Sequence, residues 1–158
     1  MAQPGLIVFD LDFTLWDCGG LWVDCTSYPF RKNGDGTIVD SDGRVLRLYE
    51  DALDIIGEIE ASGIPVGLAS RTERPDWAVD LLELMGIRER CDYEEIYPGS
   101  KVTHFRRLAE DSGLTFEEML FFDDERRNIV EVGALGVTCV EVKNGINRAV
   151  FEDGLAQF

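Results

Sequence analysis

The feature that most limits the possible folds of this chain is a set of short, continuous apolar runs. They are residues 6–9 (LIVF), 64–69 (IPVGLA), 119–122 (MLFF) and, with some polar residues, 137–142 (VTCVEV). A strand with one face in water alternates apolar and polar residues, whereas a strand covered on both faces does not. The runs therefore predict a parallel sheet with helices on both sides.

Segments with helical periodicity lie between and after these runs. We expect helices over residues 49–62, 75–85, 102–112, 126–135 and 146–157. Each of the first four is followed directly by a glycine, which suits the position just after a helix C-terminus. Strands that alternate with helices predict an α/β fold, a doubly wound, Rossmann-like parallel sheet flanked by helices.

Residues 17–48 interrupt this alternation. Two turn-forming clusters, residues 33–36 (NGDG) and 40–43 (DSDG), bracket short apolar segments. The pattern predicts a small antiparallel β flap inserted after the first strand. No linker or internal repeat divides the remainder, so we expect a single domain over residues 1–158, a length that can bury one core.

The net charge of the chain limits the classes of molecule that it can bind. The chain has 15 Lys and Arg against 31 Asp and Glu, a net charge of −16, which repels nucleic acid and anionic membranes. A phosphorylated substrate would need local positive charge, and a bound metal ion is one source.

One histidine and four cysteines without a CxxC pair argue against a structural zinc site. The absence of any apolar run near the roughly 20 residues of a membrane span predicts a cytoplasmic protein.

Polar side chains suited to phosphate chemistry follow the strand-like runs. They are Asp10 and Asp12, Ser70 and Arg71, and Asp123 and Asp124, while Lys101 begins a helix between the last two groups. Ligands of open α/β sheets bind beyond the carboxyl ends of the strands. Four carboxylates gathered there would repel one another unless a cation lay between them, and hard oxygen ligands suit Mg²⁺.

These motifs resemble those of a known superfamily. Residues 9–16 (FDLDFTLW) resemble the DxDxT motif that opens haloacid dehalogenase (HAD) superfamily phosphohydrolases. Ser70, Lys101 and the pair Asp123-Asp124 match the later motifs in order. The stretches ASRT (69–72), YPGSK (97–101) and FFDDERRN (121–128) resemble more narrowly the magnesium-dependent phosphatase 1 family. The resemblance covers about residues 5–158.

The resemblance implies a role for each matched residue. Asp10 would be a nucleophile that forms an aspartyl-phosphate, an acid anhydride, and Asp12 the general acid and then the general base. Mg²⁺ would be held by the Asp10 carboxylate, the Asp12 backbone carbonyl, Asp123 and, through water, Asp124. Ser70, Lys101 and Arg71 would bind the phosphoryl oxygens.

The implied activity is phosphoric monoester hydrolysis. The implied substrates are phosphotyrosine proteins or sugar phosphates such as fructosamine 6-phosphates. A phosphoaspartate receiver-like signalling domain and a non-catalytic binding module are alternatives. Receivers gather an acidic pair after the first strand and phosphorylate an aspartate from a later strand, so the DxDxT arrangement on the first strand argues against a receiver. Retention of every motif argues against the module. Phosphoryl transfer to a sugar usually needs a larger cap than this flap.

Other side chains near the motifs have weaker predicted roles. We expect Thr14 to brace the first-strand loop, and Asn128 to hydrogen-bond the metal-site carboxylates. Trp16 and Trp22 either line the pocket or pack the flap onto the core. The single histidine, His104, is expected at an exposed helix position.

Overall fold

A computed structural model describes residues 2–158 of the chain. Its main sheet has five parallel strands in the order β7-β6-β1-β8-β9. The strands are β1 (Leu6–Phe9), β6 (Val66–Ser70), β7 (Tyr93–Ile96), β8 (Met119–Asp123) and β9 (Thr138–Glu141). The first strand, β1, therefore lies at the centre, which confirms the predicted doubly wound sheet.

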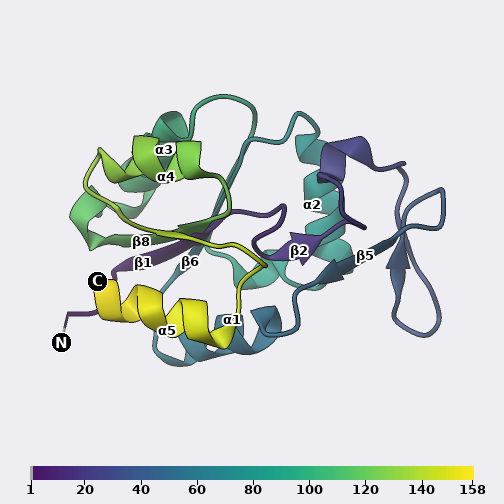
Figure 1. The fold of residues 1–158 in the computed structure, drawn as a ribbon, viewed down its shortest axis with the longest axis horizontal. Helices are drawn as coiled ribbons and strands as arrows, with labels where there is room; N and C mark the ends of the chain where they lie inside the picture. The colour runs from purple at the N-terminus through teal and green to yellow at the C-terminus, as the bar shows by residue number, and fades with distance from the viewer. Residues whose placement is uncertain (1) are drawn as a thin grey trace.

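Helices cover both faces of this sheet (Figure 1). They are α1 (Ala52–Ala61), α2 (Pro75–Leu84), α3 (Lys101–Ser112), α4 (Arg126–Gly133) and α5 (Arg148–Gln157). In Figure 1, α3 and α4 lie on one side of the strands, and α1 and α5 lie on the other. Within residues 2–158, the structure contains no helix with the length and apolar character that a membrane crossing requires.

The central strand shows why both faces must be covered. Successive side chains of a strand point to opposite faces, so Leu6 and Val8 pack into the cluster that includes Phe105 of α3. Ile7 and Phe9 pack into the other cluster, with residues of α1 and α5. All four residues of β1 are 0% exposed. The continuous apolar run is thus the consequence of two cores, one on each side of the sheet.

Strand β7 was missing from the sequence prediction. Its residues, YEEI, are all half-buried, and two of the four are glutamates. The strand lies at the edge of the sheet and pairs only with β6 in the described part of the chain. An edge strand tolerates charged side chains, so it has no continuous apolar run to reveal it.

The flap forms a second, antiparallel sheet in the order β2-β5-β4-β3, which confirms its prediction. Its strands are β2 (Trp16–Asp17), β3 (Arg31–Lys32), β4 (Ile38–Val39) and β5 (Val45–Leu48). Tyr28 and Phe30 of the flap pack on Trp77 of α2, and the Tyr28 and Trp77 rings stack with centroids 5.3 Å apart. These aromatic contacts hold the flap against α2.

Candidate active site

The carboxyl ends of β1, β6 and β8 and the start of α3 surround a cavity of about 300 Å³. Its lining contains Asp10, Asp12, Ser70, Arg71, Thr72, Lys101 and Asn128, together with Trp22, Asp24, Glu73, Glu125 and Arg127. The cavity thus brings together side chains that lie more than 100 residues apart in the sequence. Asp123 lies directly behind it, within hydrogen-bond distance of Lys101.

Asp10 lies at the end of β1 and is 7% exposed. Its amide donates to Phe122 O (3.0 Å), which continues the pairing of β1 with β8 beyond the last residue of β1. Lys101 Nζ donates to Asp10 Oδ1 (2.7 Å), and Thr14 Oγ1 donates to Oδ2 (3.1 Å). Each carboxylate oxygen is therefore held by its own donor, and the predicted bracing role of Thr14 is confirmed.

Lys101 is the first residue of α3, whose N-cap Ser100 accepts a hydrogen bond from Val102 N. The Lys101 side chain is 1% exposed. Besides its bond to Asp10, Lys101 Nζ donates to Asp123 Oδ2 (2.6 Å). Burial alone would lower the pKa of the Lys101 ammonium, but the carboxylates of Asp10 and Asp123 outweigh it and raise this pKa. The lysine is therefore a buried cation between two carboxylates.

A tight turn follows β1 and carries Asp12. The Leu11 carbonyl accepts hydrogen bonds from three amides of this turn, and Phe13 has a φ of 62°, which is rare for a residue with a side chain. Asp12 Oδ1 accepts from Trp16 Nε1 (2.8 Å) and from Val23 N (2.9 Å). Burial, with a contribution from Asp10, raises the pKa of Asp12 to about 7. A carboxyl with such a pKa can donate a proton near neutral pH.

Three carboxylates converge beside this turn. Asp10, Asp123 and Asp124 each offer an oxygen, and these oxygens lie within 4.8 Å of one another. Burial and the neighbouring carboxylates raise the pKa of Asp123 to about 6 and that of Asp124 to about 9. The cluster therefore has too little positive charge around it, even with Lys101. A set of hard oxygen donors with excess negative charge fits Mg²⁺.

Other side chains that line the cavity offer hydrogen-bond donors. Ser70 is 3% exposed, and its Oγ accepts from Thr72 N (3.2 Å), which leaves the hydroxyl hydrogen for an acceptor in the cavity. Arg71 Nη1 donates to Asn128 Oδ1 (3.2 Å), and Asn128 Nδ2 donates to Asp123 Oδ2 (3.0 Å). The predicted contact of Asn128 with a metal-site carboxylate is confirmed.

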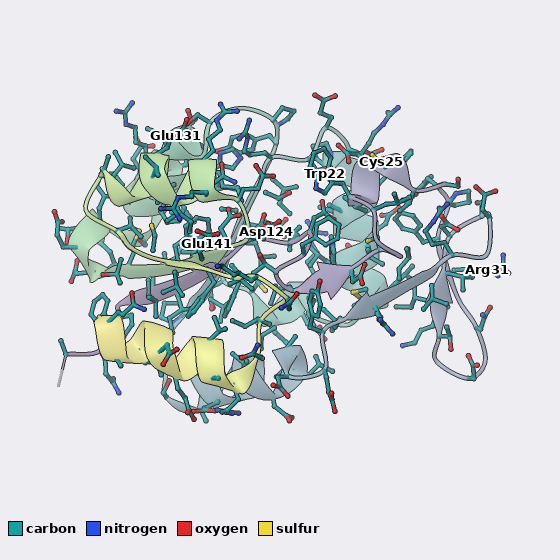
Figure 2. The ribbon with its side chains drawn as sticks, viewed as in Figure 1. Trp22, Cys25, Arg31, Asp124, Glu131 and Glu141 are labelled. Atoms are coloured by element: carbon teal, nitrogen blue, oxygen red, sulfur yellow. The ribbon has the colours of Figure 1, made fainter. Side chains whose placement is uncertain are left out.

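The rim of the cavity contains residues that the sequence did not single out. Asp24, Glu73 and Glu125 come from turns and helix starts, where no strand-end pattern marks them. Trp16 and Trp22 have different surroundings. Trp22 lines the cavity and is 52% exposed, whereas Trp16 is wholly buried and bonds to Asp12. Figure 2 shows Trp22 beside Cys25 on the flap side of the site, and Asp124 toward the centre of the molecule.

The prediction that His104 is exposed was wrong. The side chain is fully buried, and its Nε2 lies 2.8 Å from both Ser70 O and Tyr97 O. A signal for burial was present in the sequence, because His104 lies three residues after Lys101 and four before Leu108. This is the spacing of one helix face, and both of those residues are buried.

Comparisons with known proteins identify the family and the fold of the chain. The acid phosphatase family model matches residues 2–158. The chain is 46% identical over 156 residues to magnesium-dependent phosphatase 1 of Homo sapiens, covering 98% of this chain and 87% of that protein. It is 39% identical to a HAD-like hydrolase superfamily protein of Schizosaccharomyces pombe, covering 94% and 92% of the two chains. A solved HAD-superfamily hydrolase from Ehrlichia chaffeensis has the same fold, with a TM-score of 0.70 at 9% identity over 99% of this chain and 97% of that one.

Proposed function

Because the chain belongs to the acid phosphatase family within the haloacid dehalogenase superfamily, we propose that Asp10 is the nucleophile of its reaction. The protein is a magnesium-dependent phosphatase, a phosphoric monoester hydrolase. The observation that supports the proposal most is the fixation of Asp10 at the cavity, with Lys101 Nζ on one oxygen and Thr14 Oγ1 on the other. Both donors fix the orientation of the carboxylate, and a nucleophile has to be held in a defined position.

In the first step, an oxygen of Asp10 forms a bond to phosphorus while the bond between phosphorus and the leaving oxygen breaks. Asp12 gives its proton to that leaving oxygen, a contribution of typically about 10²–10⁴-fold. In the second step, the Asp12 carboxylate accepts a proton from water. The water oxygen bonds to phosphorus as the bond to Asp10 breaks, and inorganic phosphate is released.

The remaining side chains bind and orient the phosphoryl group. Ser70 has a hydroxyl hydrogen to donate, and Lys101 places its ammonium beside Asp10. Arg71 lines the same cavity with a forked guanidinium, a geometry suited to phosphate oxygens. Mg²⁺, held by the three clustered carboxylates and the Asp12 carbonyl, would supply the positive charge that lets an anionic nucleophile approach an anionic phosphate.

The test is hydrolysis of an aryl phosphate with Mg²⁺, with a chelator, and with Asp10→Asn. Asp17→Asn is a matched control, because Asp17 is an aspartate of the neighbouring strand β2 and is absent from the lining of the cavity. We expect phosphate release that requires both Mg²⁺ and Asp10. Activity of Asp10→Asn at the level of the Asp17→Asn control would contradict the proposal. A stable phosphoprotein with little turnover would favour the receiver-like alternative.

The proposed substrates are phosphotyrosine proteins or sugar phosphates such as fructosamine 6-phosphates. Trp22 is the flap side chain placed to distinguish them, because it is half-exposed and lines the cavity. An indole at this position can stack on the ring of a phosphotyrosine. Phe30, another aromatic residue of the flap, packs on Trp77 and does not line the cavity.

The roles of these two aromatics can be separated by substitution. We expect Trp22→Ala to lower kcat/KM for a phosphotyrosine peptide several-fold more than for a sugar phosphate, by loss of stacking worth roughly 0.5–1.5 kcal/mol. Phe30→Leu serves as the control and should leave the ratio unchanged. An unchanged ratio in Trp22→Ala would show that the indole does not set the substrate preference.

A further inference from the structure

His104 is the single histidine of the chain, and the proposed reaction does not use it. It lies in α3, one turn after Lys101, and is 0% exposed. A fully buried histidine needs hydrogen-bond partners for its ring nitrogens, because an unpaired polar group in the core is costly. The partners of His104 therefore show what holds it there.

All the polar contacts of the ring are to backbone carbonyls near the site. Nε2 lies 2.8 Å from Ser70 O and 2.8 Å from Tyr97 O, and Nδ1 lies 3.2 Å from Ser100 O. Carbonyl oxygens only accept hydrogen bonds, so the two short contacts assign the proton of the neutral ring to Nε2, which donates to both carbonyls. Nδ1 then has no hydrogen to donate to Ser100 O. The imidazole also stacks on the Tyr97 ring, with centroids 4.1 Å apart and planes at 16°.

The two contacts of Nε2 join the end of β6, which carries Ser70, to the loop that leads into α3 and Lys101. Ser70 ends β6, Tyr97 follows β7, and Ser100 caps the helix that begins with Lys101. Between Tyr97 and Ser100 the backbone turns through Gly99, which has a φ of 112°. The main chain makes one tie here, because Tyr97 N donates to Ser70 O (3.1 Å). The imidazole adds a second tie, through a side chain of α3 itself, between β6 and this short glycine-containing loop before Lys101.

We propose that His104 is a positioning residue that fixes the Ser70 hydroxyl and the Lys101 ammonium relative to each other for binding of the phosphoryl group. The residue touches neither the substrate nor the reacting atoms. It acts through the main chain of Ser70 and through the loop before Lys101. The inference rests on the proposed phosphate-binding role of Ser70 and Lys101, so the experiment has to test that role separately.

The experiment compares three variants. His104→Phe keeps an aromatic ring to stack on Tyr97 but removes the donor. His104→Gln keeps an N–H donor at about the distance of Nε2 along the side chain. Leu108→Ala is the matched control, because Leu108 is buried on the same face of α3, one turn further on, and belongs to the apolar core. For each variant, kcat and KM for an aryl phosphate, the Ki of inorganic phosphate and the unfolding temperature are measured at saturating Mg²⁺.

We expect His104→Phe to raise the Ki of phosphate and to lower kcat/KM by roughly 10–100-fold, because a displacement of about 1 Å in a positioning group can cost 10²-fold. His104→Gln should recover most of this loss. Leu108→Ala should lose stability while its Ki stays within about two-fold of the original. A folded His104→Phe protein with an unchanged Ki, or a His104→Gln protein as impaired as His104→Phe, would overturn the proposal.

Ser70→Ala tests the phosphate-binding role of Ser70 separately from the positioning role of His104. If Ser70→Ala leaves the Ki of phosphate unchanged, the proposed phosphate-binding role of Ser70 is wrong, and the inference about His104 falls with it. If Ser70→Ala raises the Ki and the folded His104 variants do not, only the inference about His104 is wrong.

A measurement on the unmodified protein does not depend on the folding of any variant. Because the chain has one histidine, its imidazole nitrogens give a single pair of NMR signals. The proposal expects a proton on Nε2 that exchanges slowly with water, as a buried donor shared by two carbonyls should. An Nε2 without a proton would overturn the proposal, since it could not donate to Ser70 O and Tyr97 O.

Discussion

At the scale of single residues, Lys101 is the group on which the charge balance of the site depends. Its ammonium makes ion pairs with Asp10 and Asp123, at 2.7 and 2.6 Å, and these are the only ion pairs of the carboxylate cluster within residues 2–158. Its own pKa is raised by these carboxylates against the opposing effect of burial. The stability of the metal-free protein should therefore depend on this side chain as well as its activity.

We expect Lys101→Met to lower the free energy of unfolding by about 3–5 kcal/mol in the absence of Mg²⁺, because it leaves two buried carboxylates without their partner. Urea unfolding at neutral pH measures this change. Lys143→Met is the control, since Lys143 is exposed and makes none of the ion pairs found in the described residues. Equal stability of the two variants would mean that the buried ion pairs contribute little.

His104 predicts a pH dependence of stability. Burial lowers its pKa below the ordinary value of 6.5, so the folded protein resists a proton that the unfolded chain accepts. Above about pH 6.5 the imidazole is neutral in both the folded and the unfolded state, so its titration does not change the free energy of unfolding. Below that pH the unfolded state gains protons, and the free energy of unfolding falls by up to about 1.4 kcal/mol per pH unit.

His104→Gln lacks this titration and provides the comparison. The free energy of unfolding of the original protein minus that of His104→Gln should decrease between pH 7.5 and pH 5.5. Urea unfolding at several pH values measures the difference. A difference that stays constant across this range would show that the pKa of His104 is the same in the folded and unfolded states.

At the scale of elements, the packing of α5 on the sheet depends on a glycine. A Cβ on Gly154 would lie 2.5 Å from Cζ of Phe122, and Phe122 is a buried residue of β8 stacked on Phe9. Gly57 of α1 has more room, because the atom nearest to a Cβ at that position would be Arg90 Nη2, at 3.5 Å. The two helices that cover the same face of the sheet therefore differ in how closely they approach their neighbours.

Gly154→Ala should destabilise the protein by up to about 2 kcal/mol, because overpacking of the core costs about 1–3 kcal/mol and the gain in helix propensity is about 1 kcal/mol. Gly57→Ala should stabilise it by up to about 1 kcal/mol, since only the propensity changes. Thermal or urea unfolding of the pair measures both effects. Stabilisation by Gly154→Ala would mean that α5 can move away from Phe122 at little cost.

The strands show which parts of the fold and of the site could be predicted from the sequence. Runs buried on both faces revealed β1, β6 and β8, and their polar ends led to Asp10, Ser70 and Asp123. A less pure apolar run revealed β9, an edge strand with one buried residue. Strand β7 has no such run, because it is an edge strand with two half-buried glutamates. The rim residues Asp24 and Glu73 could not be predicted, because the fold of the flap and its contact with α2 bring them to the cavity.

At the scale of the whole molecule, the net charge of −16 acts on any anionic substrate. The rim of the cavity adds the carboxylates of Asp24, Glu73 and Glu125, against the guanidinium groups of Arg71 and Arg127. Exposed charges interact over a Debye length of about 8 Å at physiological ionic strength, and added salt screens them.

A cytoplasmic location remains a prediction of the sequence alone.

This charge predicts an effect of salt that depends on the substrate. A phosphopeptide flanked by acidic residues should have a lower kcat/KM than one flanked by lysines at low ionic strength, and added salt should bring the two values together. Initial rates at constant Mg²⁺ and increasing NaCl measure this. A preference for the acidic peptide at low salt would show that local cations of the site outweigh the charge of the whole molecule.

The role of Asp10 can be tested most directly by trapping the covalent intermediate. The protein is mixed with an aryl phosphate and Mg²⁺, quenched in acid and treated with borohydride, which reduces an aspartyl-phosphate to homoserine. Mass spectrometry of the digested protein then locates the modified residue. We predict homoserine at position 10 and unmodified aspartate at positions 12, 123 and 124. Modification at another aspartate, or none during rapid turnover, would contradict nucleophilic attack by Asp10.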